Sequence, residues 1–156
     1  MNWDAIGAIG EIVGASAVVL SLFYLGMQIR VQNRETRLAA MHEISSAFRE
    51  AYSVFNGSEI ADIFVRGNAD FQSLNAAEKV RLFAMINPLL KVLEEAFWQH
   101  KQGRLDEELW YPMARMFSFF LSAGTFQQVW KQRRSHYNDS FQEFVEGLEL
   151  TEYEIK

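Results

Sequence analysis

A chain of 156 residues with 49% hydrophobic and 14% aromatic residues has the apolar content of a folded domain, which excludes global disorder. The net charge is -5, and residues 31–156 retain about -4 of it once Asp4, Glu11 and Arg30 are set aside, so a general nucleic-acid surface is not expected. The absence of cysteine excludes a disulfide framework, a thiolate nucleophile and a cysteine-based zinc site.

The N-terminal segment has the length and composition of a transmembrane helix. The run Ile12–Ile29 contains no charged side chain and, at about 1.5 Å per residue, covers roughly 27 Å, close to the hydrocarbon core of a bilayer. Trp3 and Tyr24 lie about 31 Å apart on a helix, which suits aromatic rings at two membrane interfaces. A buried core helix and a cleaved signal peptide are the alternatives, and Met1–Asp4 lacks the basic side chain that a signal peptide needs. We therefore expect one transmembrane helix over residues 1–30.

Three arginines follow the apolar run directly, namely Arg30, Arg34 and Arg37. The positive-inside bias places the C-terminal domain in the cytoplasm and the N-terminus outside. The three arginines fall near one helical face and are candidates to bind anionic lipid headgroups, each for about 1 kcal/mol. An ordinary solvated helix face is the alternative.

Small side chains recur on one side of the apolar helix. Gly10, Gly14, Ala17 and Ser21 are spaced by four, three and four residues, so they gather on a single stripe. Small residues let a second helix approach closely in a membrane. This pattern predicts that the helix associates with a second copy or with another membrane protein.

One acidic residue, Glu11, lies beside that stripe. A carboxyl group that faces lipid is costly unless protein shelters it, so we expect Glu11 to face protein. It is either a pore-lining or ion-linked acid, or an interfacial carboxyl near the outer boundary of the membrane. The second interpretation is the simpler one.

The apolar helix is expected to continue beyond the membrane as a stem. Neither proline nor glycine occurs between Met27 and Asn56, and the apolar residues keep the three-and-four spacing of an amphipathic helix. The Asn56-Gly57 pair is typical of a helix end. The apolar face of this predicted stem consists of Val31, Leu38, Met41, Phe48, Tyr52 and Phe55.

Residues 58–156 are predicted to form a small helical bundle. A short helix is expected from Ser58, as its N-cap, to Arg66. Asn75 and Glu78 form a capping signal for a longer helix that Pro88 is expected to kink or divide. The apolar stripe of this longer helix consists of Val80, Phe83, Ile86, Leu89, Leu90, Leu93 and Phe97.

Three further helices complete the expected bundle. They run from Asp106 to about Ala123, closed by Gly124; from Thr125, with Gln128 in a capping box, to about Ser135; and onward from Asp139 or Ser140. No stretch alternates with period two, so strands are not expected. The predicted fold class is all-α, with one N-terminal transmembrane helix continuing into an amphipathic stem (residues 31–56) and then a small helical bundle (residues 58–156), the last two together forming the helical domain 31–156.

Three segments carry a resemblance to other proteins. WDAIGAIGEIVGASAVVLSLFYLGMQIR, FWQHKQGRLDEELW and VWKQRRSHYNDSFQEFV together resemble a group of small bacterial membrane proteins with a Gly- and Ala-rich N-terminal helix that contains a Glu. These segments follow the same order over most of the chain, but none is a mechanistic motif. The resemblance implies a bacterial inner-membrane location, and it implies no activity.

No residue pattern predicts a catalytic, cofactor or metal site. The histidines His42, His100 and His136 fall in different predicted elements, and none of them has a second histidine three or four residues away. A corner between two predicted helices gathers acidic side chains, but acids at a helix start are already favoured by the helix dipole. That corner consists of Glu94, Glu95, His100, Asp106, Glu107 and Glu108.

A short basic cluster, Trp130–Arg134, is a second candidate for a binding surface, toward RNA or an acidic partner. Basic residues in the last turn of a helix complement its dipole, so a solvated helix end is the preferred interpretation.

Taken together, the sequence predicts a single-pass, membrane-anchored interaction or accessory protein, either a homo-oligomer or a subunit of a larger membrane complex. The expected partners are membrane lipid and a membrane protein, and nucleic acid is not among them. The alternative is an oligomeric pore or transport element with Glu11 facing the path. An enzyme that uses the acidic corner is the least supported hypothesis.

Overall fold

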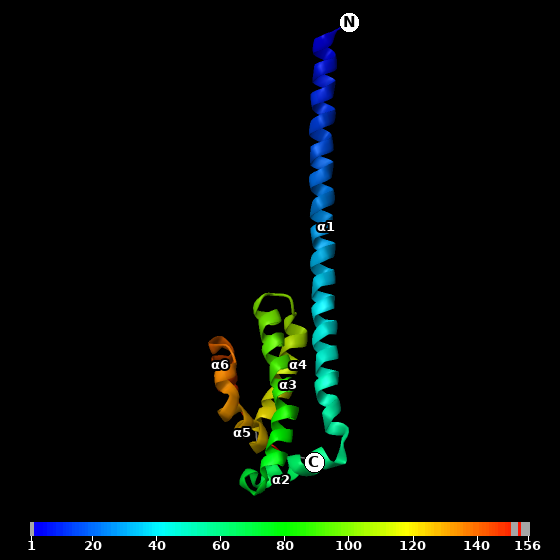
Figure 1. Ribbon diagram of the computed structural model, residues 1–156. Coiled ribbons are helices and arrows are strands. Elements are labelled where there is room, and N and C mark those ends of the chain that lie inside the picture. Colours follow the sequence, from blue (N-terminus) through cyan, green and yellow to red (C-terminus); the bar gives the residue numbers. More distant parts are fainter. Residues whose placement is uncertain (1, 151–152, 154–156) are drawn as a thin grey trace. The chain divides into compact units, whose positions relative to one another are not determined.

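The computed structural model describes residues 2–150 and 153, apart from the side chains of Ala5 and Ile6. These residues form helices and turns, with no strand among them, which confirms the expected all-α class (Figure 1). Contacts divide the chain into two compact units, residues 1–39 and residues 40–156. The division therefore falls inside the segment that was expected to be the stem.

The first helix, α1 (Trp3–Ser53), is continuous through the apolar run and the predicted stem. Because α1 contains no proline, and no glycine after Gly26, nothing interrupts its backbone hydrogen bonds beyond that residue. The α-helix ends at Ser53, whose hydroxyl donates to the carbonyl oxygen of Glu50 at 2.6 Å. The helix end predicted at Asn56-Gly57 lies beyond the observed end, because the residues after Ser53 form a 3-10 turn, η1 (Val54–Asn56).

The second unit contains the C-terminal part of α1 and the remaining described elements. These are α2 (Ser58–Ala69), η2 (Phe71–Ser73), α3 (Ala76–Lys101), α4 (Glu107–Ser122), α5 (Gly124–Arg133), η3 (Arg134–His136) and α6 (Asp139–Glu146). Figure 1 shows α3 alongside α4 within this unit.

Helix α3 supplies the centre of the core. Its capping box is confirmed, since Asn75 Oδ1 accepts from the Glu78 backbone at 3.0 Å and the Glu78 carboxylate accepts from the Asn75 backbone at 2.8 Å. Pro88 lies inside the helix without dividing it. Val80 is 65% exposed, so its assignment to the apolar stripe was wrong. The fully buried side chains of α3 are Leu82, Met85, Ile86, Leu89, Leu90, Leu93 and Ala96.

The last part of α1 is built into this core rather than standing free as a stem. Ile44 is 1% exposed, and the Phe48 ring meets the Phe117 ring edge-on at 6.0 Å. Tyr52 lies 6.4 Å from Phe120, ring centre to ring centre. Residues 40–53 therefore belong to the bundle that α3 and α4 complete.

Two helix starts differ from the sequence-based expectation. Helix α2 has Gly57 as its N-cap, so Ser58 is the first helical residue, and the helix extends beyond Arg66 to Ala69. Gly124 opens α5 instead of closing the preceding helix, and the N-cap of α5 is Ala123. The predicted capping box of Thr125 with Gln128 does not form, because Thr125 is the second residue of α5 and not its N-cap. The backbone N–H and the hydroxyl of Thr125 donate to a side chain of α2.

Candidate membrane segment and flanking residues

The N-terminal unit presents an apolar helix whose described side chains are exposed throughout residues 7–39. Trp3, Leu20 and Phe23 are each 69% exposed. Among the described residues, α1 is the one helix long and apolar enough to cross a membrane, and none of its most apolar window is buried. A soluble core helix would have most of that surface covered by protein.

The small-residue stripe lies on this exposed helix. At about 100° per residue, Gly10, Gly14, Ala17 and Ser21 fall within an arc of roughly 60°. A Cβ atom added to Gly10 or Gly14 would meet nothing within 4 Å. The stripe is therefore a smooth surface with open space in front of it.

Glu11 lies about 100° around the helix from Gly10, so it borders the stripe without belonging to it. Its side chain is exposed. Two polar side chains of the apolar segment are satisfied within the helix: Ser16 Oγ donates to the Ile12 carbonyl oxygen at 2.7 Å, and Gln28 Nε2 donates to the Tyr24 hydroxyl at 3.0 Å. Such bonds let polar groups enter a bilayer at reduced cost.

Arg30, Arg34 and Arg37 occupy roughly the opposite side of α1 from the small residues. Counting about 100° per residue, the three guanidinium groups fall within an arc of roughly 60°. All three side chains are exposed. A helix packed against the stripe would therefore leave these cations outside the contact.

The acidic corner does not converge on one point. The carboxylate of Glu94 accepts from Lys91 Nζ at 2.7 Å and from the Asn138 backbone at 3.0 Å, so it holds the loop before α6. The imidazole of His100 stacks on Trp110 with ring centres 4.9 Å apart. Among residues 2–150 and 153, no three His, Asp or Glu side chains form a metal-binding group.

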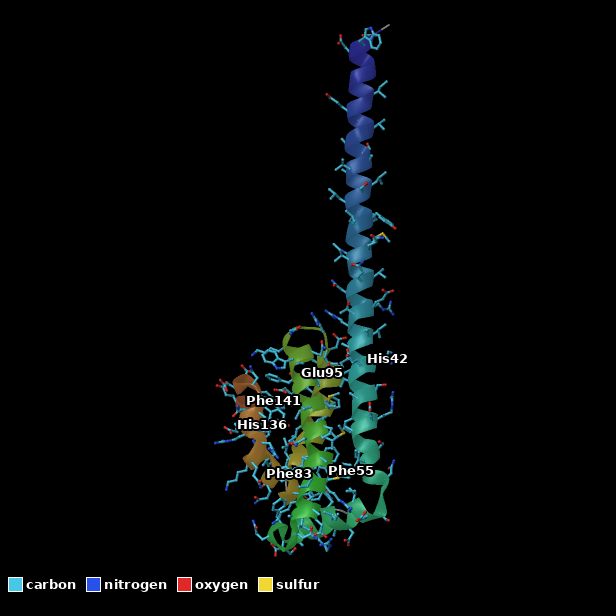
Figure 2. The ribbon with its side chains drawn as sticks, in the orientation of Figure 1. His42, Phe55, Phe83, Glu95, His136 and Phe141 are labelled. Atoms are coloured by element: carbon cyan, nitrogen blue, oxygen red, sulfur yellow. The ribbon has the colours of Figure 1, made fainter. Side chains whose placement is uncertain are left out.

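The three histidines lie on three different elements. Figure 2 shows His42 on α1 and His136 on η3, while His100 belongs to α3. The basic cluster near the end of α5 is engaged in packing and pairing: the guanidinium of Arg133 lies 5.0 Å from the centre of the Phe83 ring, and Arg134 Nη1 lies 2.7 Å from a carboxylate oxygen of Glu146.

Several ionisable groups in the bundle carry shifted pKa values, and two of them, Glu78 and Tyr137, lie at helix connections. The hydrogen bond from Arg66 holds the pKa of the Glu78 carboxyl below its ordinary value, and the backbone N–H of Asn75 acts in the same direction. Burial raises the pKa of the Tyr137 phenol to about 12, and the nearby Glu94 carboxylate adds to the rise. Lys91 Nζ lies 4.2 Å from the centre of the Tyr137 ring, so Lys91, Glu94 and Tyr137 together fix the segment between α5 and α6.

Asn68 on α2 is a structural residue that the sequence did not point to: its side-chain oxygen accepts hydrogen bonds from the backbone N–H and the hydroxyl of Thr125. Its partner Thr125 is far along the chain, and the only local signal is an Asn near the end of a short helix.

Comparison of the chain with protein-family models, with curated proteins and with solved structures finds no match. The functional inference therefore rests on the residues of α1 and of the bundle, and on no relative.

Proposed function

We propose that the chain is a single-pass membrane protein in which α1 anchors a helical interaction or accessory domain. The observation that carries this proposal is the exposure of every described side chain of residues 7–39, within which Ile12–Ile29 has no charge. Burying a large aliphatic or aromatic side chain is worth about 1.5–3 kcal/mol, so leaving this many in water is unfavourable. A lipid environment removes that cost, and the helix satisfies its own backbone groups there.

The proposed location is the bacterial inner membrane, with the N-terminus outside and the C-terminal domain in the cytoplasm. The orientation is supported by Arg30, Arg34 and Arg37 on one side of the span and by the lack of basic residues in positions 1–29. The bacterial inner membrane is the location that the resemblance of the three sequence segments implies. On the cytoplasmic side these arginines are placed to bind anionic lipid headgroups.

The proposed mode of action is assembly through the small-residue stripe, either with a second copy or with another membrane protein. The open space at Gly10 and Gly14 supports a close helix contact. In a parallel pair, packing on this stripe would keep the arginines of the two copies on outer faces, where they would not repel across the contact. Membrane lipid and a membrane protein are the proposed partners; nucleic acid, a cofactor and catalysis form no part of the proposal.

Topology provides the experiment, because the natural chain has no cysteine. Asn2→Cys and Gln32→Cys are compared in intact cells with a maleimide that cannot cross the membrane. Labelling of Asn2→Cys alone, with Gln32→Cys reacting only after permeabilisation, is the expected result. Equal labelling of both variants in a soluble extract contradicts the anchor, and the inverse pattern contradicts the orientation.

A second candidate function is an oligomeric pore or transport element. The observation in its favour is Glu11, an exposed acid that interrupts the apolar surface of α1 next to the stripe. If Glu11 faces a path for ions, Glu11→Gln will change ion flux in liposomes while the assembly stays intact. Flux that is absent, or that is the same in both proteins, refutes this alternative.

A further inference from the structure

A cavity of 240 Å³ lies in the second unit, between α4, α5, α6 and the segment that follows α6. Its walls are mainly apolar, and it uses no residue of the N-terminal unit. Binding of a ligand in this cavity therefore does not require any residue of the membrane segment.

The inner surface of the cavity is preformed. Leu121 and Val145 are 3% and 6% exposed, so they belong to the core and form its floor. Trp130 supplies an aromatic wall, held by the Tyr137 ring at 5.3 Å and edge-on by the Phe141 ring at 5.9 Å. An aromatic wall fixed by two neighbours favours the stacking of a planar ligand.

The rim carries hydrogen-bond acceptors. Gln127 Nε2 donates to the Ser122 carbonyl oxygen at 3.2 Å, which leaves the amide oxygen of Gln127 to accept. One carboxylate oxygen of Glu146 accepts from Arg134 at 2.7 Å, and a carboxylate has a second oxygen. Because Arg134 balances the charge of Glu146, this rim suits a neutral ligand that donates a hydrogen bond.

We propose that this cavity binds a compact, neutral aromatic compound of about the size of indole, with one hydrogen-bond donor directed at the rim. An apolar protein cavity of about 150 Å³ already holds benzene, so the larger volume here suits a bicyclic ring. Apolar burial against Leu121, Val145 and Trp130 provides the affinity, and the rim oxygens select for the donor.

The test uses the full chain in lipid nanodiscs, because detergent monomers would compete for an apolar cavity. Binding of 6-fluoroindole is followed by its fluorine resonance. Val145→Phe fills the cavity from its floor, and Leu109→Phe, an exposed position on α4 away from the lining residues, is the matched control. Saturable binding that Val145→Phe weakens at least tenfold and Leu109→Phe leaves unchanged is the expected result.

Each remaining outcome bears on the proposal. Absence of saturable binding up to the solubility limit overturns it, and so does binding that Val145→Phe leaves intact. If Val145→Phe does not fold, Leu148→Phe fills the same space from the half-buried turn after α6, and the same two results apply. Loss of the donor in 1-benzofuran is expected to weaken binding about 2- to 10-fold, in line with one hydrogen bond; equal or tighter binding of indole-3-acetate contradicts the acceptor rim.

Discussion

The side-chain oxygen Oδ1 of Asn68 accepts two hydrogen bonds from Thr125, one from its backbone N–H and one from its hydroxyl, both at 2.9 Å. Thr125 is 0% exposed and lies in the first turn of α5, where backbone N–H groups lack partners within the helix. Asn68 thus serves as an N-cap contributed by another helix, since the N-cap residue Ala123 has no side chain that can do so.

Asn68→Ala is expected to lower the free energy of unfolding by about 1–2 kcal/mol, because the variant removes a cap and leaves two buried donors of Thr125 without an acceptor. Urea denaturation followed by circular dichroism measures the change. Asn56→Ala, at the end of η1, is the control. Equal stability of the two variants would show that Asn68 does not stabilise α5.

Gly67→Ala is expected to destabilise the bundle by about 1–3 kcal/mol, since overpacking a filled core strains it. An added Cβ would lie 2.9 Å from Leu74 Cδ1 and 2.9 Å from Thr125 Cγ2. Gly26→Ala is a matched control, because Gly26 also lies inside a helix and an added Cβ there would meet nothing within 4 Å. Thermal unfolding of both variants checks the prediction, which fails if Gly67→Ala is the more stable of the two.

The distance between partners along the chain separates what the sequence predicted from what it did not. The capping box of Asn75 and Glu78 was predictable because both residues lie in one helical turn. The pairing of Asn68 with Thr125 spans 57 positions, so only the packing of α2 against α5 reveals it. The capping box expected at Thr125 does not form because α5 begins one residue earlier, at Gly124.

The candidate site divides in the same way. Helical phase is a local property, so the stripe at Gly10 and the arginine face at Arg30 follow from the spacing once α1 is known to be continuous. By contrast, whether residues 40–53 would stand free or enter the core depended on distant aromatic side chains such as Phe117. The cavity beside Trp130 likewise needs three helices to come together.

Stability is expected to fall in acid partly through Glu78. The pKa of its carboxyl is lowered in the fold, chiefly by the hydrogen bond from Arg66, so the ionised form is favoured by folding. The contribution is present above the ordinary pKa of 4.5 and is lost as the pH falls through the lower folded value. Glu78→Gln keeps the capping geometry and should flatten the pH dependence below this point, whereas Glu108→Gln, the control on α4, should not. Denaturation midpoints between pH 7 and pH 2 test this, and parallel curves for the Glu78→Gln and wild-type proteins are the contrary result.

Association through the small-residue stripe predicts a position-specific effect of bulk. Gly14→Leu places a large side chain on the stripe and should weaken association at least tenfold, because the two backbones can no longer approach. Gly26→Leu adds the same bulk on another face of α1, also with nothing within 4 Å, and should leave association unchanged. Two measurements distinguish the Gly14→Leu and Gly26→Leu variants: the mass of the complex released in lipid particles, and energy transfer between labelled copies of the chain. Indistinguishable assemblies would remove the stripe from the interface, and co-purification of a different membrane protein would identify the partner as heterologous.

The central claim is that α1 resides in lipid, and alkaline carbonate extraction of bacterial membranes containing the full-length chain tests it most directly. The wild-type protein is expected to stay with the membrane pellet. A variant with Val18→Arg and Leu22→Arg should be released, because each arginine near the centre of a span costs about 2.5–3.5 kcal/mol. Leu38→Arg, outside the apolar run, should remain in the pellet. Recovery of the wild-type chain in the soluble fraction, before or after extraction, would contradict the account.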